Sequence, residues 1–165
     1  MIDIVLVEPE IPQNTGNIAR TCVAAGVRLH LIEPLGFKID DRQVKRAGLD
    51  YWFDLDLTIW PDLDSCLRSF FGRSIYYATT KADKTYADAT YSLDSVILFG
   101  KETKGLPEPL LLAHPERCIR IPMISSARSL NLSNSAAIVI YEALRQLGFP
   151  GLSGESDFLA SQSPH

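Results

Sequence analysis

Three short stretches of the sequence combine glycine, asparagine and hydroxyl side chains in a way that suits a ligand site. They read NTGNIAR, LFGKETKGLP and SLNLSNS, and they occupy residues 14–20, 98–107 and 129–135. In the third stretch five of seven residues are short and polar, although the apolar helix predicted to follow needs only one such residue as its cap. Backbone N–H groups and small hydroxyls at such a place can bind an adenine or a ribose. The alternative is elaborate capping of the helix.

The glycine loop in the second stretch has the glycine spacing of a phosphate-binding loop but not its chemistry. Leu106 and Pro107 stand where such a loop has its lysine and its serine or threonine, so nothing remains to contact a terminal phosphate or hold magnesium. The fingerprint G-x-G-x-x-G is absent after the first predicted strand, which disfavours a Rossmann-type dinucleotide site. What remains is a glycine loop in which Glu102 lies between two lysines.

The first stretch contains a candidate anion-binding side chain. Asn17 and Arg20 lie one turn apart at the start of a predicted helix, so they can face the same point. An arginine there offers a planar fork that matches a phosphate. The alternative is a surface arginine beside a capped helix.

Composition and charge indicate one globular domain of ordinary make-up. The chain has 165 residues, 46% of them hydrophobic and 22% charged. A formal net charge of −4 argues against a protein that coats nucleic acid with its whole surface, but a local basic patch can still bind RNA. Four cationic residues do gather within nine positions, namely Lys38, Arg42, Lys45 and Arg46.

The cysteines and the chain's apolar runs predict a cytoplasmic protein without a metal site. The three cysteines are widely spaced among apolar neighbours, as expected of reduced, buried thiols. They share no metal-ligand spacing with the three histidines. The first ten residues lack the features of a signal peptide, and no apolar run approaches the length of a membrane span.

Alternating strand and helix patterns predict an α/β fold with a mostly parallel sheet covered by helices on both faces. Five short, nearly continuous apolar segments are the predicted strands, at residues 2–7, 27–32, 74–80, 95–100 and 118–123. Loops that follow such strands hold ligands in α/β proteins. Caps and glycines predict helices from Asn14 or Thr15 to about Ala25, from Asp40 to near Gly48, from Asp62 or Asp64 to Gly72, from Pro107, and over 132–147.

The last predicted helix is apolar on more than one side. Ile138 and Tyr141 widen its apolar surface beyond the stripe that a single packing face needs. Such a helix requires a second partner, which could be another copy of the chain. We expect one domain over residues 1–151, and a flexible tail rich in serine, glycine and proline over 152–165.

Taken in this order, the three stretches resemble the three motifs of the SPOUT (SpoU–TrmD) methyltransferases. NTGNIAR resembles the first motif, LFGKETKGLP the second and IRIPMISSARSLNLSNSAAIVIYEALRQ the third, and the likeness covers about residues 2–151. The resemblance implies a deep C-terminal trefoil knot, although knots are otherwise essentially absent from proteins. It also implies a homodimer and S-adenosyl-L-methionine as cofactor, with S-adenosyl-L-homocysteine as product. The implied reaction methylates the ribose 2′-hydroxyl of the wobble pyrimidine, C or modified U, in a tRNA anticodon stem-loop, with leucine isoacceptors as expected substrates.

The resemblance also assigns roles to individual residues. The expected catalytic residues are Arg20, Asn17, Glu102 and Tyr141. The expected cofactor contacts, mostly through the backbone, are Ala78, Gly100, Ile121, Ser129 and Leu130. The expected RNA contacts are Lys38, Arg42, Lys45, Arg46 and Arg128. Because a guanidinium stays protonated in proteins, we expect Arg20 to orient the ribose and stabilise the developing alkoxide, while water or an RNA phosphate accepts the proton. No metal is required.

Three alternatives remain open at this point. The first is a SPOUT enzyme for another tRNA position or for ribosomal RNA, but such relatives often carry an extra RNA-binding domain. The second is a non-catalytic RNA-binding or cofactor-sensing module, which the intact Arg20, Asn17, Glu102 and Ser129 disfavour. The third is a small-molecule phosphate enzyme, which the missing lysine of the glycine loop disfavours.

Overall fold

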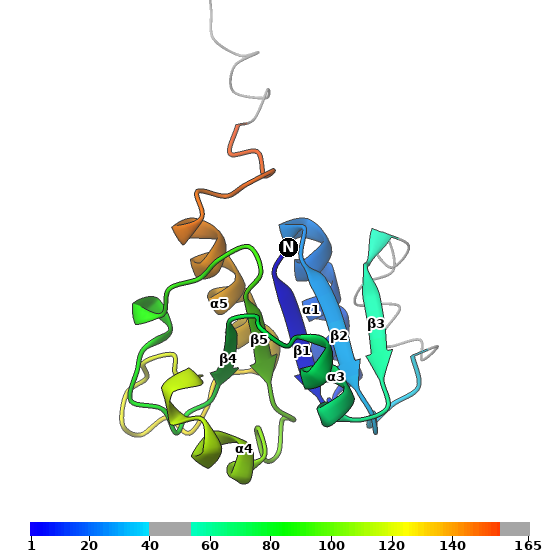
Figure 1. Ribbon diagram of the computed structural model, residues 1–165, viewed down its shortest axis with the longest axis vertical. Helices are drawn as coiled ribbons and strands as arrows, with labels where there is room; N and C mark the ends of the chain where they lie inside the picture. The colour runs from blue at the N-terminus through cyan, green and yellow to red at the C-terminus, as the bar shows by residue number, and fades with distance from the viewer. Residues whose placement is uncertain (40–53, 156–165) are drawn as a thin grey trace, which may run out of the picture.

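The computed structural model describes residues 1–39 and 54–155. Its six strands form one parallel sheet in the order β3-β2-β1-β5-β4-β6 (Figure 1). The strands are β1 (Asp3–Val7), β2 (Arg28–Ile32), β3 (Leu57–Trp60), β4 (Ile75–Ala78), β5 (Val96–Phe99) and β6 (Cys118–Ile119). The chain leaves β1 toward β2 on one side, while β5 pairs with β1 on the other. The carboxyl ends of β1 and β5 therefore lie at a switch point of the sheet, where α/β proteins hold ligands.

Helices cover both faces of this sheet (Figure 1). The helices are α1 (Pro12–Ala25), α3 (Leu63–Ser69), α4 (Glu108–Ala113) and α5 (Leu132–Gln146), with 3-10 turns η2 (Tyr86–Asp88) and η3 (Pro115–Arg117). Side chains alternate along β1, so Ile4 and Leu6 pack with α1 and α5, whereas Val5 and Val7 pack on the face of α3 and α4. The predicted α/β architecture is confirmed.

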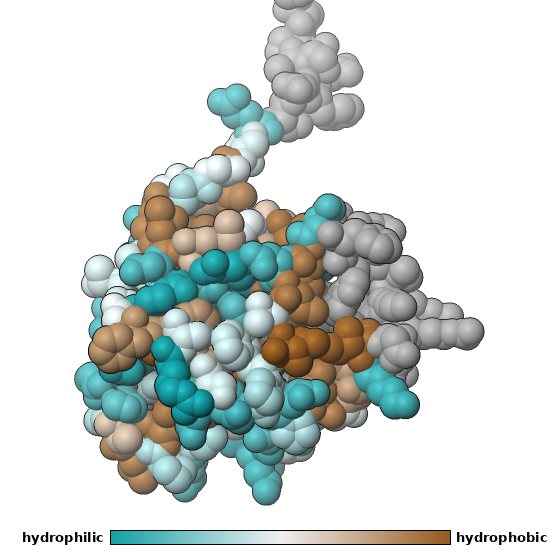
Figure 2. All heavy atoms as spheres, turned by 45° about the vertical axis from the view of Figure 1, so that its right-hand side comes forward, coloured by the Kyte–Doolittle hydropathy of each residue, from teal (hydrophilic) through white to brown (hydrophobic). Residues whose placement is uncertain are grey.

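Among the described residues, the buried core cluster on the α3 and α4 face of the sheet is smaller than the cluster on the α1 and α5 face. Figure 2 turns the β3 side forward and shows hydrophilic and apolar side chains interspersed over it. Phe70 and Cys66 nevertheless bury apolar surface between α3 and the sheet. Within the described ranges, no helix combines the length and the apolar character needed to cross a bilayer.

All five predicted strands are present, but a sixth was missed. β3 is only partly buried and lies at the edge of the sheet, so it lacks the continuous apolar run that reveals a strand covered on both faces. The last predicted strand is also shorter than expected, because β6 ends at Ile119. The expected helix from Asp40 to near Gly48 lies outside the described residues.

The prediction that Asn14 or Thr15 caps the first helix was wrong. α1 begins at Pro12, its N-cap residue Ile11 makes no side-chain cap bond, and Asn14 and Thr15 are buried inside the first turns. Proline suits this position because its missing N–H would have no helical partner there. At the other end, Gly26 adopts the predicted left-handed conformation, with φ of 62°.

The other helix ends follow ordinary capping chemistry. Asp62, rather than Asp64, caps α3 by accepting a hydrogen bond from the Ser65 N–H at 2.7 Å. α3 then ends at Ser69, before the expected Gly72. Leu152, which was assigned to the tail, packs against the core formed with α1 and α5. The trefoil knot implied by the resemblance stays a prediction.

Candidate active site

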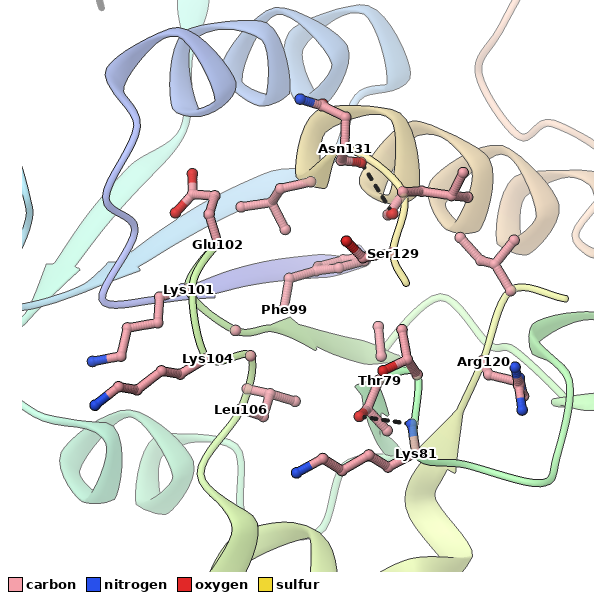
Figure 3. A pocket seen from close by; sticks show the side chains of 18 of the residues that line it. Thr79, Lys81, Phe99, Lys101, Glu102, Lys104, Leu106, Arg120, Ser129 and Asn131 are labelled. Atoms are coloured by element: carbon pink, nitrogen blue, oxygen red, sulfur yellow. Dashed lines mark hydrogen bonds between the residues drawn. The ribbon is translucent and has the colours of Figure 1, made fainter. Parts of the chain in front are cut away.

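A cavity of about 610 Å³ opens where β4, β5 and β6 end. Most of its walls come from four segments of the chain, within residues 78–81, 99–106, 119–123 and 128–132, and the lining is completed by Ile11, Asn14, Tyr86, Leu111, Ser135 and Val139. Figure 3 shows Glu102 and Asn131 above the cavity, with Lys101 and Lys104 on one side and Arg120 on the other. The second and third polar stretches of the sequence therefore meet at one site, whose volume suits a small-molecule cofactor.

The loop after β5 folds back on itself in a way that only glycine permits at one position. The Gly105 N–H donates to the Lys101 carbonyl at 2.8 Å. This turn brings the backbone of Gly105 so close that a Cβ on Gly100 would lie 1.9 Å from its carbonyl carbon. Gly100 is therefore required by the close approach of two backbone segments at the cavity wall.

Glu102 is the cap that α1 lacks in its own sequence. Its carboxylate accepts hydrogen bonds from the backbone N–H groups of Glu10 at 2.8 Å and Ile11 at 3.2 Å, and from Asn14 Nδ2 at 3.0 Å. These donors lie at the start of the helix, where backbone N–H groups lack helical partners and a negative charge is favourable. The loop after β5 thus fixes the start of α1.

The residues on either side of Glu102 bind the same segment. Thr103 donates to the Glu10 carboxylate from its backbone N–H at 3.0 Å and from Oγ1 at 2.8 Å, and Lys101 forms an ion pair with Glu8. The hydrogen bonds from Thr103 lower the pKa of Glu10, and the hydrogen bond to Glu8 raises the pKa of Lys101. We call these contacts of residues 101–103 with residues 8–14 the interloop clamp.

Asn14 joins the clamp to the third polar stretch. Asn131 Nδ2 donates to Asn14 Oδ1 at 3.0 Å, while Asn131 Oδ1 caps α5 by accepting from the N–H groups of Ser133 at 2.9 Å and Asn134 at 3.3 Å. One asparagine of SLNLSNS therefore caps the helix and also holds it against α1. Asn14 was not a predicted site residue. Its place in NTGNIAR was the signal available in the sequence.

The five expected cofactor contacts are brought together. All of them line the 610 Å³ cavity, namely Ala78, Gly100, Ile121, Ser129 and Leu130. Glu102 and Arg128 also line it. Several other lining residues had no role assigned to them from the sequence, namely Thr79, Lys81, Tyr86, Arg120 and Met123, although Arg120 and Met123 lie within the third motif. Those from 79 to 86 belong to a polar loop for which no motif could be assigned.

Three of the expected catalytic residues are not among those that line the cavity. Asn17 and Arg20 are exposed on α1, whose buried side carries Ile18, Ala19 and Cys22 instead. Tyr141 is 44% exposed on α5. Of the expected RNA contacts, Lys38 is exposed outside the lining, and Arg42, Lys45 and Arg46 lie outside the described residues.

The chemistry of the cavity fits a cofactor held by the backbone. Loop segments and apolar side chains such as Leu106, Leu130 and Val139 form much of its wall, while the Glu102 carboxylate is used by the clamp. In the part of the chain that the structure describes, no three histidine, cysteine, aspartate or glutamate side chains are arranged to hold a metal ion.

Comparisons with known proteins identify the class. The SpoU rRNA Methylase family matches residues 1–141. The tRNA (cytidine(34)-2′-O)-methyltransferase of Escherichia coli K12 is 47% identical over 152 residues, which cover 92% of this chain and 97% of that protein. A crystal structure from Bacillus anthracis, 46% identical, matches with a TM-score of 0.88 over 94% of this chain and 100% of the other.

A structure with bound cofactor is also similar. The AdoMet-bound rRNA methyltransferase of Sinorhizobium meliloti is 26% identical and has a TM-score of 0.80, covering 88% of this chain and 56% of that one. Because the family match spans most of the sequence, this chain belongs to the SpoU methylase family. The SPOUT resemblance seen in the three sequence motifs is thereby confirmed.

Proposed function

We propose that this protein is an S-adenosyl-L-methionine-dependent methyltransferase that methylates the ribose 2′-hydroxyl of cytidine 34 in tRNA. The observation that carries the proposal is the convergence of the second and third motif stretches on one cavity, in a chain 47% identical to a tRNA (cytidine(34)-2′-O)-methyltransferase over 92% of its length. A modified uridine at the same wobble position and leucine isoacceptors are the finer substrate assignments that we propose with it.

The cavity would hold the cofactor between the loop after β5 and the loop before α5. Backbone groups near Gly100, Ile121 and Ser129 suit the polar edge of an adenine and its ribose, and the apolar side chain of Leu130 suits the ring face. When bound, S-adenosyl-L-methionine supplies an activated methyl group. Positioning of the two reactants then supplies much of the rate, and the interloop clamp keeps the cavity wall in place.

Arg20 would act on the ribose rather than on the cofactor. Its guanidinium can orient the 2′-hydroxyl and stabilise the negative charge that develops there, with Asn17 in support, while water or an RNA phosphate accepts the proton. Both residues lie on the exposed side of α1, so the RNA substrate or a second copy of the chain must complete the site around them. We propose that no metal takes part.

A homodimer would cover the exposed apolar side of α5. Ile138 is 36% exposed and Tyr141 44% exposed on this helix, and burial of such side chains against a second copy is favourable. Tyr141 would then lie at the dimer interface or reach the partner's site. RNA phosphates would bind Lys38, Arg128 and the basic residues Arg42, Lys45 and Arg46, and the cytoplasm, where tRNA is available, would be the compartment.

Methylation of total tRNA from cells that lack this enzyme tests the proposal. Wild-type protein and an Arg20→Ala variant are incubated with labelled S-adenosyl-L-methionine, and nuclease mapping locates the label. We expect label on the ribose of a wobble pyrimidine, strongly reduced by the substitution. Label in ribosomal RNA but not in tRNA would overturn the substrate assignment, and failure to bind the cofactor would overturn the enzyme assignment.

A further inference from the structure

The cationic side chains at the cavity differ in whether they have a carboxylate partner. Lys81 forms an ion pair with Glu108, and Lys101 forms one with Glu8. Three other cations also line the cavity, namely Lys104, Arg120 and Arg128. Within residues 1–39 and 54–155, none of these three takes part in an ion pair. They are therefore available to an anion that is not part of the protein.

Arg120 is the most firmly placed of the three. Its N–H donates to the Lys84 carbonyl at 2.9 Å, and its carbonyl accepts from the Tyr86 N–H at 2.8 Å. Arg120 is also partly buried, whereas Lys104 and Arg128 are exposed. Figure 3 shows it across the cavity from Lys101 and Lys104, on the side where β6 ends. Arg120 is thus held at the wall by its backbone, while its guanidinium forms no ion pair with any residue that the structure describes.

An unpaired, partly buried guanidinium favours an anionic ligand. Charged groups that lose water are stabilised only if they gain a partner, and the planar fork of arginine matches the oxygen atoms of phosphate or carboxylate. If the proposed function holds, two anions can reach this cavity. They are an RNA phosphate and the carboxylate of the cofactor. The cofactor's carboxylate adjoins its own ammonium group, whereas an RNA phosphate has no internal partner.

We propose that Arg120 binds a backbone phosphate of the RNA substrate beside the target nucleotide. The inference rests on the proposed function and adds a contact within the cavity to the RNA contacts outside it. The phosphate lies against the wall formed by the loop that includes Lys84 and Tyr86. This loop is polar and open to solvent, so the RNA backbone can continue past it. Arg120 thereby sets where the nucleotide enters, while the loop after β5 and the loop before α5 hold the cofactor.

The test compares Arg120→Gln with Arg120→Lys and with Arg68→Gln as a matched control. Arg68 lies on α3, on the other face of the sheet, and its side chain bonds only Ser65 among the described residues. We measure tRNA affinity at several salt concentrations, S-adenosyl-L-methionine affinity by calorimetry, and thermal melting of each variant. For Arg120→Gln we expect tRNA affinity to fall about tenfold and the slope of log affinity against log salt to decrease by about one.

The remaining arms separate the possible sources of the anion. Cofactor affinity should stay within about twofold of wild type, Arg120→Lys should restore the salt slope but only part of the affinity, and Arg68→Gln should behave as wild type. A loss of cofactor affinity with tRNA affinity unchanged would assign Arg120 to the cofactor carboxylate and overturn the proposal. Unchanged affinity for both ligands would also overturn it. If wild-type protein binds tRNA without methylating nucleotide 34, the proposed function fails, while the binding comparison still decides the role of Arg120.

Discussion

At the amino end of the sheet a carboxylate is enclosed by its partners, whereas at the carboxyl end a carboxylate holds two loops at the wall of an open cavity. The enclosed group is Asp3 on β1, which is fully buried. It accepts hydrogen bonds from Arg28 Nε at 2.7 Å and Nη2 at 2.8 Å, from His30 Nε2 at 2.7 Å, and from Arg73. Both carboxylate oxygens of Asp3 are thus bonded to donors of the protein itself.

The two networks have different consequences for charge. Burial alone would raise the pKa of Asp3, but the hydrogen bonds from His30, Arg28 and Arg73 outweigh it and hold the pKa well below its usual range. Because Trp60 Nε1 donates to His30 Nδ1 at 3.1 Å, the other ring nitrogen is left to donate to Asp3. At the cavity, in contrast, Glu102 binds mostly backbone donors.

The difference teaches which network serves stability and which serves function. A closed network of charged partners rigidifies the strands that it joins but offers nothing to a ligand. The carboxylates of the interloop clamp are already bonded to groups of the protein. The cations at the cavity, such as Arg120 and Arg128, remain available to a ligand. Substitutions at the amino end should therefore change stability without changing the chemistry, whereas substitutions at the carboxyl end should also change cofactor binding or turnover.

The largest effect is expected at Asp3. Asp3→Ala leaves two arginines and a histidine without their buried acceptor, and we expect the free energy of unfolding to fall by about 3–5 kcal/mol. Urea denaturation measures the loss, with Asp83→Ala, an exposed carboxylate outside the network, as the control. Methyl transfer per folded molecule should be unchanged. A loss below about 1 kcal/mol would contradict the enclosed-network account.

The next effect is expected at Gly100. Because an added Cβ would lie 1.9 Å from the Gly105 carbonyl carbon, Gly100→Ala must displace the loop after β5. Such crowding costs about 1–3 kcal/mol, and a cost of that size in cofactor binding corresponds to an affinity for S-adenosyl-L-methionine that is about fivefold to more than a hundredfold lower in calorimetry. Gly154→Ala, where the added carbon meets nothing within 4 Å, is the control. Equal cofactor affinity in the two variants would contradict the assignment of the loop after β5 as a wall of the cofactor site.

A smaller effect is expected at Glu102. Glu102→Gln keeps the size of the side chain but removes the charge and one acceptor, so the start of α1 loses part of its cap. We expect about 1–2 kcal/mol less stability and a lower kcat, read from urea melts and from initial rates. Glu108→Gln, whose ion pair with Lys81 is solvent-exposed, should cost less than about 1 kcal/mol. Identical kinetics for the two variants would contradict the role of the clamp.

The most gradual effect is the pH dependence of stability. The folded pKa of Asp3 is depressed, so its contribution is fully present above the unfolded value near pH 4 and is lost as pH falls toward the folded pKa, by up to about 1.4 kcal/mol per pH unit. Asp3→Asn should remove this component from unfolding free energies measured between pH 5 and pH 2. The pKa of Glu10 is also depressed, and the pKa of Glu142 is lowered to about 2, so both groups act in the same pH window. The relevant quantity is therefore the difference between wild type and Asp3→Asn. Parallel curves of unfolding free energy against pH for the two proteins would contradict the predicted contribution of Asp3.

Local patterns in the sequence predicted most of the fold. Buried strands such as β1 and β5 are continuous apolar runs, and Gly26 correctly predicted where α1 ends. The edge strand β3 was missed because partial burial leaves no such run. The start of α1 was wrong because its cap, Glu102, comes from a residue 92 positions away in the chain from Glu10, and a cap supplied from that distance leaves no local signal.

The candidate site was predictable only in part for the same reason. The motif resemblance identified the five cofactor positions, and the fold brings all of them to one cavity. Asn14 was interpreted as a helix cap, yet it connects Glu102 and Asn131, two residues that are remote from it in sequence. Arg120 and Tyr86 enter the cavity wall through the pairing of Thr85 with Arg120, which depends on tertiary structure. Spacing along the chain does not report such contacts.

The most direct test of the account uses a tRNA anticodon stem-loop with a single 2′-deoxynucleotide. Wild-type protein, labelled S-adenosyl-L-methionine and three RNAs are compared, carrying ribose throughout, 2′-deoxycytidine at nucleotide 34, or a 2′-deoxynucleotide at position 35. Removing one hydroxyl leaves the phosphates and the base in place, so binding is preserved. The account predicts that methyl transfer is lost only with the 2′-deoxycytidine at 34. Undiminished transfer to that RNA would contradict methylation of the wobble ribose.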